Sequence, residues 1–567
     1  MATRTLAGLM TSSVAPLQLR GFRSLWGASL FSNIGGFLQA SAAAWLMLDL
    51  TGSATWVGLI SASTTLPFLA LALLAGAVAD MRDRVRILLV SQIAMAIAAA
   101  AMAVLAFVGE ATPVRLLVLG LLIGVAGSFN LPAWQALVPD LVPREMIASA
   151  VALNSVSFNV ARAVGPALGG LLIATVGAEA GFGLNALSYL SVVIALWLIG
   201  RTGTQKPADV APLTTAMALG WRFARYTHSF RRVLMFGALF GITSSVVPTV
   251  LPSHTEALGG GSLAYGVLLG TMGLGAVGSA FARRRLAESL KKWTVPAAIA
   301  GYSLGGIVIG LAPSLAWAVS GLVVSGASLV LATTTLNSTA QMLSPRWVRG
   351  RTMSLWSLAF AGMTPIGAIL AGAVADTLTT RASYVLISLA GVGLAIASIR
   401  SGIPVLSEIV PPEFDPDRAA PEHVETLDSG PVMVLNGFDL DPGQVDEFLE
   451  AMQDLRLVRL RTGAYRWRLY RDAADPRRLI EMFLVVSWRE HLNQHRRIDD
   501  VSAALIRRAR AFDRTGEPRS RHLIAVDVEK PPDFDLLLAT HAHMHETDGS
   551  ILLEETAEFD AIRRDHI

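Results

Sequence analysis

Long apolar runs alternate with short charged segments from the N-terminal region to Arg400. A helix of about 20 apolar residues is long enough to cross the hydrocarbon core of a bilayer. Twelve such runs can be marked, so the pattern predicts an all-α polytopic membrane protein with twelve transmembrane helices. The expected spans are 25–48, 55–79, 87–108, 114–137, 148–176, 182–199, 233–252, 263–281, 296–311, 317–341, 352–375 and 382–399.

The basic residues between these runs predict the orientation. With the N-terminus on the cytoplasmic side, every Lys and Arg up to Arg400 falls in a cytoplasmic segment, except Arg115, Arg381 and Arg162. Arg115 and Arg381 fall outside, and Arg162 lies within a span. Because positive charge is retained on the cytoplasmic side, we expect a multi-pass protein of the cell inner membrane with both termini in the cytoplasm.

The composition supports this class. The chain is 53% hydrophobic and 16% charged, whereas soluble domains carry about 25% charge. The absence of cysteine excludes disulfides, thiolate metal sites and a cysteine nucleophile. The sequence contains no Walker-type nucleotide loop, which argues against transport driven by ATP. We expect no cleaved signal peptide, no nucleic-acid partner and no cofactor. The expected partners are the lipid bilayer and a small-molecule substrate.

Two halves of the apolar region resemble each other. The motif of Gly76 to Asp80, followed by three arginines, recurs as Gly275 to Ser279 with three more arginines at an offset of 199. Leu-Val-Pro-Arg at 141–144 matches Leu-Ser-Pro-Arg at 343–346, and Gly165-Pro166 matches Thr364-Pro365. The pattern predicts pseudo-symmetric six-helix halves, 1–200 and 233–404, with a substrate site between them. The linker, 201–232, carries Trp221, Phe223 and Tyr226 among arginines and is expected to form an interfacial helix.

These motifs resemble those of a known family. Residues 76–86 (GAVADMRDRVR) resemble the cytoplasmic loop signature of the major facilitator superfamily, and 165–170 (GPALGG) the fifth-span signature of its exporters. Segments 32–35, 141–144 and 349–354 resemble the transmembrane secretion effector branch, which includes the enterobactin exporter. The resemblance implies proton-coupled export of a siderophore- or drug-like molecule by alternating access. Import by the same fold is the rival. Met81 and Asp83 depart from the usual loop pattern.

Two groups of residues are expected to control the conformational change. Asp80 is predicted to act as a gate latch near the arginines of its loop; the alternative is a solvated loop acid. The second group is a stretch of small residues in the fifth span, predicted to act as a hinge or seal, with helix packing alone as the alternative. The gating candidates are Gly76, Asp80, Arg82, Arg84, Arg86, Gly165, Pro166, Gly169 and Gly170.

Polar residues within the spans are candidates for lining a substrate cavity. Arg162 is expected to face the interior, because an unpaired charge near the bilayer centre is costly. It could bond to Asn130, Asn159 or helix carbonyls, or bind an anionic substrate group. No carboxylate is expected at that depth, and Asp49 and Asp376 fall near outer ends, so proton coupling rests on the resemblance. The cavity candidates are Asn33, Gln39, Asn130, Gln135, Asn159, Arg162, Thr334 and Asn337.

The residues after Arg400 are denser in charge and predict a soluble domain. A Pro- and acid-rich linker, 405–430, precedes a β-α-β-β-α-β order typical of the ferredoxin-like fold, 431–530, and a tail, 531–567. The expected strands are 432–438, 465–471, 479–488 and 522–528, and the expected helices are 445–459, 491–498 and 501–512.

This domain resembles the dimeric α/β barrels that include antibiotic-biosynthesis monooxygenases. The resemblance rests on Gly463, 465–470, Asp475-Pro476, Ser487-Trp488, and His491 with His495. It implies either a cofactor-free oxygenase or a non-catalytic module that senses a ligand or dimerises. We favour the second and predict no catalytic residue. His541, His543 and His545 alternate in the tail, where a solvated tail is favoured over a metal site.

Overall fold

The computed structural model describes residues 14–199, 213–345, 347–403, 430–515 and 520–526. Packing divides the described chain into a helical unit and a second unit, which combines residues 218–227 with those after Pro411. Each unit is considered by itself. The tail with its three histidines, nearly all of the linker 405–430 and residues 201–212 of the other linker lie outside the described residues.

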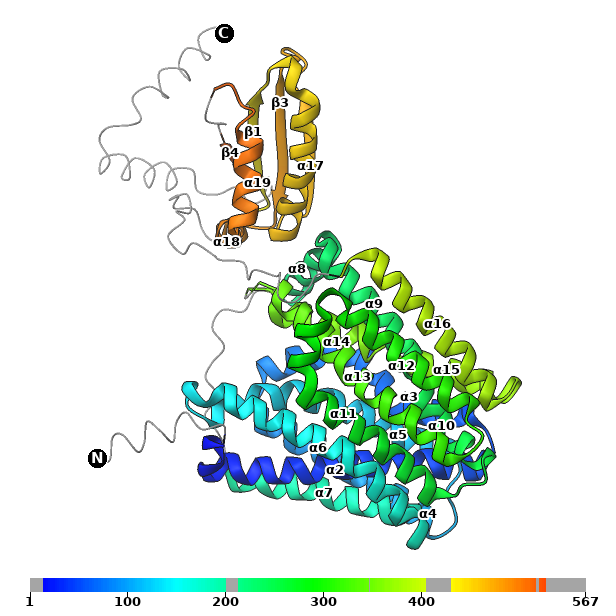
Figure 1. The fold of residues 1–567 in the computed structure, drawn as a ribbon. Helices are drawn as coiled ribbons and strands as arrows, with labels where there is room; N and C mark the ends of the chain where they lie inside the picture. Colours follow the sequence, from blue (N-terminus) through cyan, green and yellow to red (C-terminus); the bar gives the residue numbers. More distant parts are fainter. Residues whose placement is uncertain (1–13, 200–212, 346, 404–429, 516–519, 527–567) are drawn as a thin grey trace, which may run out of the picture. The chain divides into compact units, whose positions relative to one another are not determined.

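The helical unit is built from long helices joined by short turns (Figure 1). Polar caps set several boundaries: Ser53, Asp83, Thr112 and Thr379 each accept a hydrogen bond from a first-turn amide of the following helix. In the first half the helices are α2 (Arg20–Thr51), α3 (Ala54–Met81), α4 (Arg84–Phe107), α5 (Pro113–Leu137), α6 (Ile147–Thr175) and α7 (Ala178–Ile199), with short helices η1 (Ala15–Gln18), η2 (Val138–Leu141) and η3 (Arg144–Met146).

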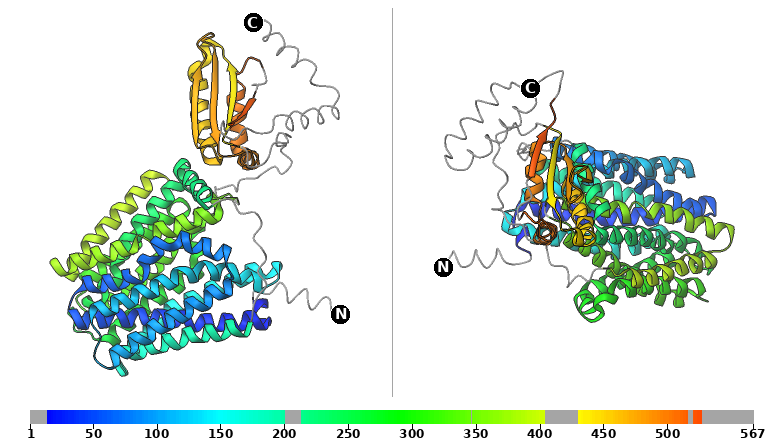
Figure 2. Two further views of the ribbon diagram at one scale, coloured as in Figure 1. Left: turned by 180° about the vertical axis from the view of Figure 1, so that it is seen from behind. Right: turned by 90° about the horizontal axis from the view of Figure 1, so that it is seen from above.

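The second half of the helical unit, from His228 onward, is also built from long helices, which Figure 2 shows from behind and from above. Its helices are α9 (His228–Ser244), α10 (Val246–Ala257), α11 (Ser262–Leu290), η4 (Lys291–Trp293), α12 (Thr294–Leu311), α13 (Leu315–Leu343), α14 (Arg349–Phe360), α15 (Thr364–Thr377) and α16 (Thr380–Ser401). A helix or pair of helices therefore stands at each of the expected spans.

Eleven of these segments within the described residues are long and apolar enough to cross a membrane. This confirms a polytopic helical membrane protein. The segment outside this set is α2, the helix at the first expected span, so the count of twelve stays a prediction. Small side chains such as Ala42 and Ala99 pack against Phe182 in the core shared by α2, α4 and α7, which brings these helices close together.

The spans expected at 233–252 and 352–375 are each interrupted. The first breaks at Ser245, between α9 and α10, and the second at 361–363, between α14 and α15. Pro365 stands in the first turn of α15, where its missing amide donor costs nothing. The matching Pro166 lies inside α6, which continues through it. The two halves therefore differ where their sequences match.

The second unit contains a four-stranded antiparallel sheet in the order β2-β3-β1-β4. Buried and half-buried residues alternate along β1, so one face of the strand packs against helices. Phe438 of β1 packs with Phe448 of α17 and Ala509 of α19 in a shared core. The elements are β1 (Val432–Asp439), η6 (Pro442–Gln444), α17 (Val445–Thr462), β2 (Arg466–Arg471), β3 (Arg478–Val485), α18 (Trp488–Arg496), α19 (Asp500–Arg510) and β4 (Ser520–Ile524), together with most of α8 (Leu213–Tyr226).

These elements confirm the predicted order of strands and helices, with one boundary corrected. The strand expected to run to 488 ends at Val485, and Trp488 opens α18. The reason is Ser487, whose hydroxyl accepts a hydrogen bond from the Glu490 amide at 3.3 Å and caps the helix.

Candidate functional site

The predicted hinge residues of α6 lie at close contacts between helices. A methyl group at Gly165 would stand 2.7 Å from Cβ of Phe37, and one at Gly169 would stand 3.2 Å from Cβ of Ser41, both on α2. One at Gly170 would collide with Gly266 of α11, in the opposite half. These glycines therefore serve close packing, two within the first half and one between halves. A hinge function stays a prediction.

A second backbone contact joins the halves through α3 and α15. A methyl group at Gly58 would stand 2.6 Å from the carbonyl oxygen of Ala368. One at Gly372 would stand 2.5 Å from the carbonyl oxygen of Ala54. Both contacts place backbone against backbone, so the halves meet without interlocking side chains at these points.

Three predicted cavity residues instead bond to neighbouring helices of the first half. Gln39 of α2 is buried, and its Oε1 accepts a hydrogen bond of 2.6 Å from Asn185 of α7. Asn33 donates to Ser157 of α6 at 3.2 Å. Asn130 of α5 accepts a bond of 3.0 Å from Gln92 of α4. Each bond satisfies a polar group between helices and so contributes to helix packing.

The other cavity candidates are not brought together by these contacts. Gln135 is exposed near the end of α5. Thr334 and Asn337 lie one turn apart on α13, both half-buried, and the Thr334 hydroxyl donates to the Val330 carbonyl at 2.6 Å. Asn159 lies on α6, and its side chain is outside the described part of the structure.

Arg162 is half-buried on α6 and lies against an aromatic ring. Its guanidinium carbon is 5.0 Å from the ring centroid of Phe158, which in turn meets Phe37 edge to face at 5.4 Å. Asn130, one predicted partner, is bonded to Gln92 instead. Among the described side chains no carboxylate or amide is bonded to Arg162. Its guanidinium instead makes a cation–π contact with the Phe158 ring.

The predicted loop signature connects α3 to α4. Gly76 and Asp80 lie on α3, and their surroundings are outside the described part of the structure. Arg82 follows the helix end and is exposed, while Arg84 and Arg86 open α4. Asp83, where the family pattern usually has glycine, caps α4 by accepting a bond of 2.9 Å from the Val85 amide.

A groove of about 920 Å³ runs from this loop along α4 and α5. Arg82, Asp83 and Arg86 line one end, and Val90 and Ile97, which are 69% and 65% exposed, are among the apolar residues beyond. Exposed apolar side chains on spanning helices face lipid, so this groove opens toward the bilayer. None of the predicted cavity residues lines it.

The interruptions of α9–α10 and α14–α15 were missed by the sequence reasoning. They lie side by side, because a methyl group at Gly241 would meet the Phe360 carbonyl and one at Gly367 the Ile242 backbone. The Tyr302 hydroxyl donates to the Ser244 carbonyl, which satisfies one group released by the break. Interrupted spans are common at transport sites. Gly362 and Pro365 were the available signal for one break.

His254 of α10 is a second residue that the sequence reasoning missed. It is buried, with Nε2 2.9 Å from the Ile309 carbonyl and Nδ1 3.1 Å from the Thr380 hydroxyl. Because a carbonyl only accepts, Nε2 must donate, and the hydroxyl can donate to Nδ1. The ring therefore ties α10 to α12 and α16.

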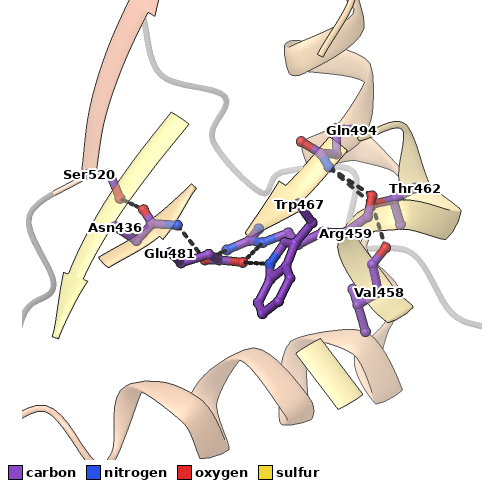
Figure 3. A network of polar contacts seen from close by, with 8 residues as sticks. All are labelled: Asn436, Val458, Arg459, Thr462, Trp467, Glu481, Gln494 and Ser520. Carbon is purple, nitrogen blue, oxygen red and sulfur yellow. Dashed lines mark hydrogen bonds and ion pairs between the residues drawn. The ribbon is translucent and has the colours of Figure 1, made fainter. Parts of the chain in front are cut away.

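The second unit contains a buried ion pair within a polar network (Figure 3). Glu481 of β3 is fully buried and accepts hydrogen bonds from Arg459 at 3.1 and 3.3 Å, Trp467 at 2.9 Å and Asn436 at 2.6 Å. Ser520 extends the network by donating to Asn436 at 2.6 Å. Such complete pairing offsets the cost of burying the charges.

His491 of α18, singled out from the sequence, is only 1% exposed. Its Nε2 is 3.3 Å from that of His495, and its ring centroid is 4.7 Å from that of His522. Burial lowers the pKa of His491 to about 3, helped by His495, His522 and Arg459. Within the described residues no group of three His, Asp or Glu side chains is arranged to hold a metal.

The helical unit and its two packed halves define a multi-pass membrane transporter. The sequence matches the family model "Transmembrane secretion effector" over residues 11–531, and the chain belongs to this family. The prediction of a major-facilitator transporter of the secretion-effector branch is confirmed.

Curated relatives and solved structures agree. The chain is 27% identical to the multidrug efflux pump Tap of Mycolicibacterium fortuitum over 387 residues, covering 66% of this chain and 93% of that protein. It is 26% identical to the enterobactin exporter EntS of Escherichia coli O1:K1 / APEC, covering 68% and 87%. An inward-facing bacterial homologue of the lysosomal transporter Spinster aligns with a TM-score of 0.53 at 15% identity, over 67% of this chain and 95% of that chain, which shows the fold.

Proposed function

We propose that this protein exports small organic molecules, siderophore- or drug-like, across the inner membrane by alternating access. The observation that carries the proposal is its similarity to Tap and EntS, which covers most of their length. The glycine contacts between α6 and α11 and between α3 and α15 support it, because smooth backbone contacts can separate without unlocking side chains.

The test compares small molecules in medium and cells by mass spectrometry, with the protein present and absent. Export predicts a molecule that leaves the cell only when the protein is present. If that efflux stops under a protonophore, export is coupled to the proton gradient, which the family resemblance favours. If a solute accumulates inside instead, the fold stands but the protein is an importer.

Arg162 supports an anionic group on the substrate. Its guanidinium contacts the Phe158 ring and is carried by a spanning helix. A partly buried cation at such a position favours the binding of an anionic group. We expect Arg162→Ala to reduce efflux of anionic molecules about tenfold or more, Arg162→Lys to keep part of it, and efflux of neutral molecules to stay. Equal efflux of both classes by Arg162→Ala would contradict this assignment.

The proposed topology has twelve spans, 1–200 and 233–404 as halves, and both termini in the cytoplasm. With 32 residues, α2 is about 48 Å long and can cross a bilayer. The arrangement of basic residues supports the orientation. Since the chain has no cysteine, single cysteines near each terminus can be labelled with a membrane-impermeant reagent. Labelling of intact cells would overturn the orientation.

The C-terminal domain is proposed to be ferredoxin-like and non-catalytic, sensing a ligand or forming dimers. The strand order β2-β3-β1-β4 supports the fold. His491 is too buried to reach a substrate from solution. On the sheet face away from Phe438, Leu435 is half-buried and Leu523 is 49% exposed, which offers an apolar surface. Reproducible oxygen uptake by the full chain with a quinol, lost in His491→Gln, would instead establish an oxygenase.

A further inference from the structure

Asp376 connects the two halves at the end of α15. Its carboxylate accepts hydrogen bonds from the backbone amides of Ala54 at 2.8 Å and Thr55 at 3.0 Å, and from the Ser53 hydroxyl at 2.5 Å. These three groups form the start of α3. Ser53 and Asp376 are 323 residues apart, so the contact is wholly tertiary.

The chemistry of the contact is that of a helix cap supplied by another helix. The first amides of a helix have no partner within it, and they lie at the positive end of the helix dipole. Ser53 also caps α3 from within the chain, by accepting from the Trp56 amide at 3.4 Å. The Asp376 carboxylate adds a negative charge and satisfies two further amides, which favours the arrangement in which α15 touches α3.

The backbone beneath Asp376 is shaped for the same contact. Ala368, Gly372 and Asp376 are spaced four residues apart and therefore follow one face of α15. The first two are the positions that meet Gly58 and Ala54 at backbone distance. The three residues thus form a continuous strip along α3, with the carboxylate at its end.

The last six residues of the strip on α15 recur in the sequence of α3. Residues 371–376 and 75–80 are both Ala-Gly-Ala-Val-Ala-Asp. In α15 the hexapeptide ends at Asp376, beside the start of α3; in α3 it ends at Asp80, about 39 Å further along the helix by its rise. One hexapeptide therefore ends α15 beside the start of α3, and the other lies near the opposite end of α3.

We propose that Asp376 is a gating residue that latches the two halves at the membrane face where α3 begins. The latch is closed in the structure described here, and it must break when that face opens. It rests on the proposed alternating access, and it pairs with the latch expected of Asp80 at the opposite face. In the proposed orientation, the Asp376 latch closes the outer side.

The test measures the distance between the halves at this face in the full-length protein in lipid nanodiscs. Because the chain has no cysteine, spin labels can be attached at introduced cysteines replacing Leu50 and Leu378, which are 41% and 59% exposed. Pulsed electron resonance then gives the populations of short and long distances. We expect Asp376→Asn to raise the long-distance population about five- to tenfold, and Ser53→Ala to raise it less.

The matched control is Asp49→Asn. Asp49 is an exposed carboxylate at the end of α2 near the same face, and no hydrogen bond to α3 is found for it among the described residues. It should leave the distances unchanged. Distances that are the same in Asp376→Asn, Ser53→Ala and the control would overturn the latch.

Efflux measured on the same variants separates this proposal from the proposed function. If Asp376→Asn shifts the distance but the unmodified protein exports nothing, the latch is supported and the proposed export is wrong. If the unmodified protein exports normally and Asp376→Asn changes neither the distance nor the efflux rate, export is supported and the latch is wrong.

Discussion

Replacing Gly170 by alanine adds a methyl group at the closest approach of α6 and α11. The methyl would lie 2.7 Å from the amide nitrogen of Gly266 and 2.8 Å from the carbonyl oxygen of Ser262, whereas real Cβ atoms essentially never lie within 3.0 Å of such neighbours. The opposing atoms are backbone, so a helix must move. Overpacking of this kind costs about 1–3 kcal/mol.

That cost acts on one conformation only. If α6 and α11 separate during transport, the methyl destabilises the closed arrangement and leaves the separated one unaffected. The ratio of separated to closed molecules should then rise by about 5- to 150-fold, which is 1–3 kcal/mol expressed as a population. Spin labels replacing Val176 and Leu263, which are 62% and 49% exposed at this end of the two helices, would report the change.

The control for Gly170→Ala is Gly127→Ala on α5. A methyl at Gly127 meets nothing within 4 Å, so it adds the same group without a collision. Both variants exchange glycine for alanine inside a helix and share any gain in helix propensity. If the two variants give the same distance populations, the closed contact between α6 and α11 does not limit the conformational equilibrium and the reasoning is refuted.

Two further predictions concern the C-terminal domain, with hydrogen exchange of the full-length protein as the measurement. Glu481→Gln should destabilise the domain by about 3–5 kcal/mol, because it leaves the Arg459 charge buried without its partner. The double variant Arg459→Met/Glu481→Leu should lose much less, and equal losses would contradict the pairing argument. The depressed pKa of His491, about 3 against an ordinary 6.5, means that the unfolded state takes up the proton first as pH falls. The stability from neutral His491 should therefore be complete above pH 6.5 and decline from there toward pH 3, by about 2–3 kcal/mol at pH 4.5. In His491→Gln, the free energy of unfolding measured from hydrogen exchange of α18 peptides should no longer decline with falling pH. If it declines as before, other groups cause the pH dependence.

The sequence reasoning located the helices well because membrane spans are decided locally. A run such as 87–108 must satisfy its own backbone hydrogen bonds in lipid, so apolarity and length determine α4 almost alone. The same reasoning failed at Ser245, because the polar residues Thr243 to Ser245 and the following Pro248 were placed inside one continuous span. The Ser244 carbonyl is satisfied there by Tyr302, a residue of another helix.

The candidate site was less accessible to sequence reasoning. Polarity identified Gln39 and Arg162 equally well as buried polar residues, but it did not say which neighbour each would meet. The structure gives Gln39 a partner in Asn185 and places Arg162 against an aromatic ring. A side chain with its bonding satisfied holds helices together, whereas Arg162, to which no carboxylate or amide is bonded among the described side chains, is proposed to bind an anion.

The sequence by itself determined the membrane class and the order of strands and helices in the C-terminal domain. Apolar period, basic loops and motif spacing are properties of neighbouring residues, and neighbours suffice for them. Tertiary structure alone decided that Gly170 meets Gly266 and that Asp376 caps α3. These contacts depend on how helices far apart in the chain pack, and no local pattern specifies which backbone will approach which.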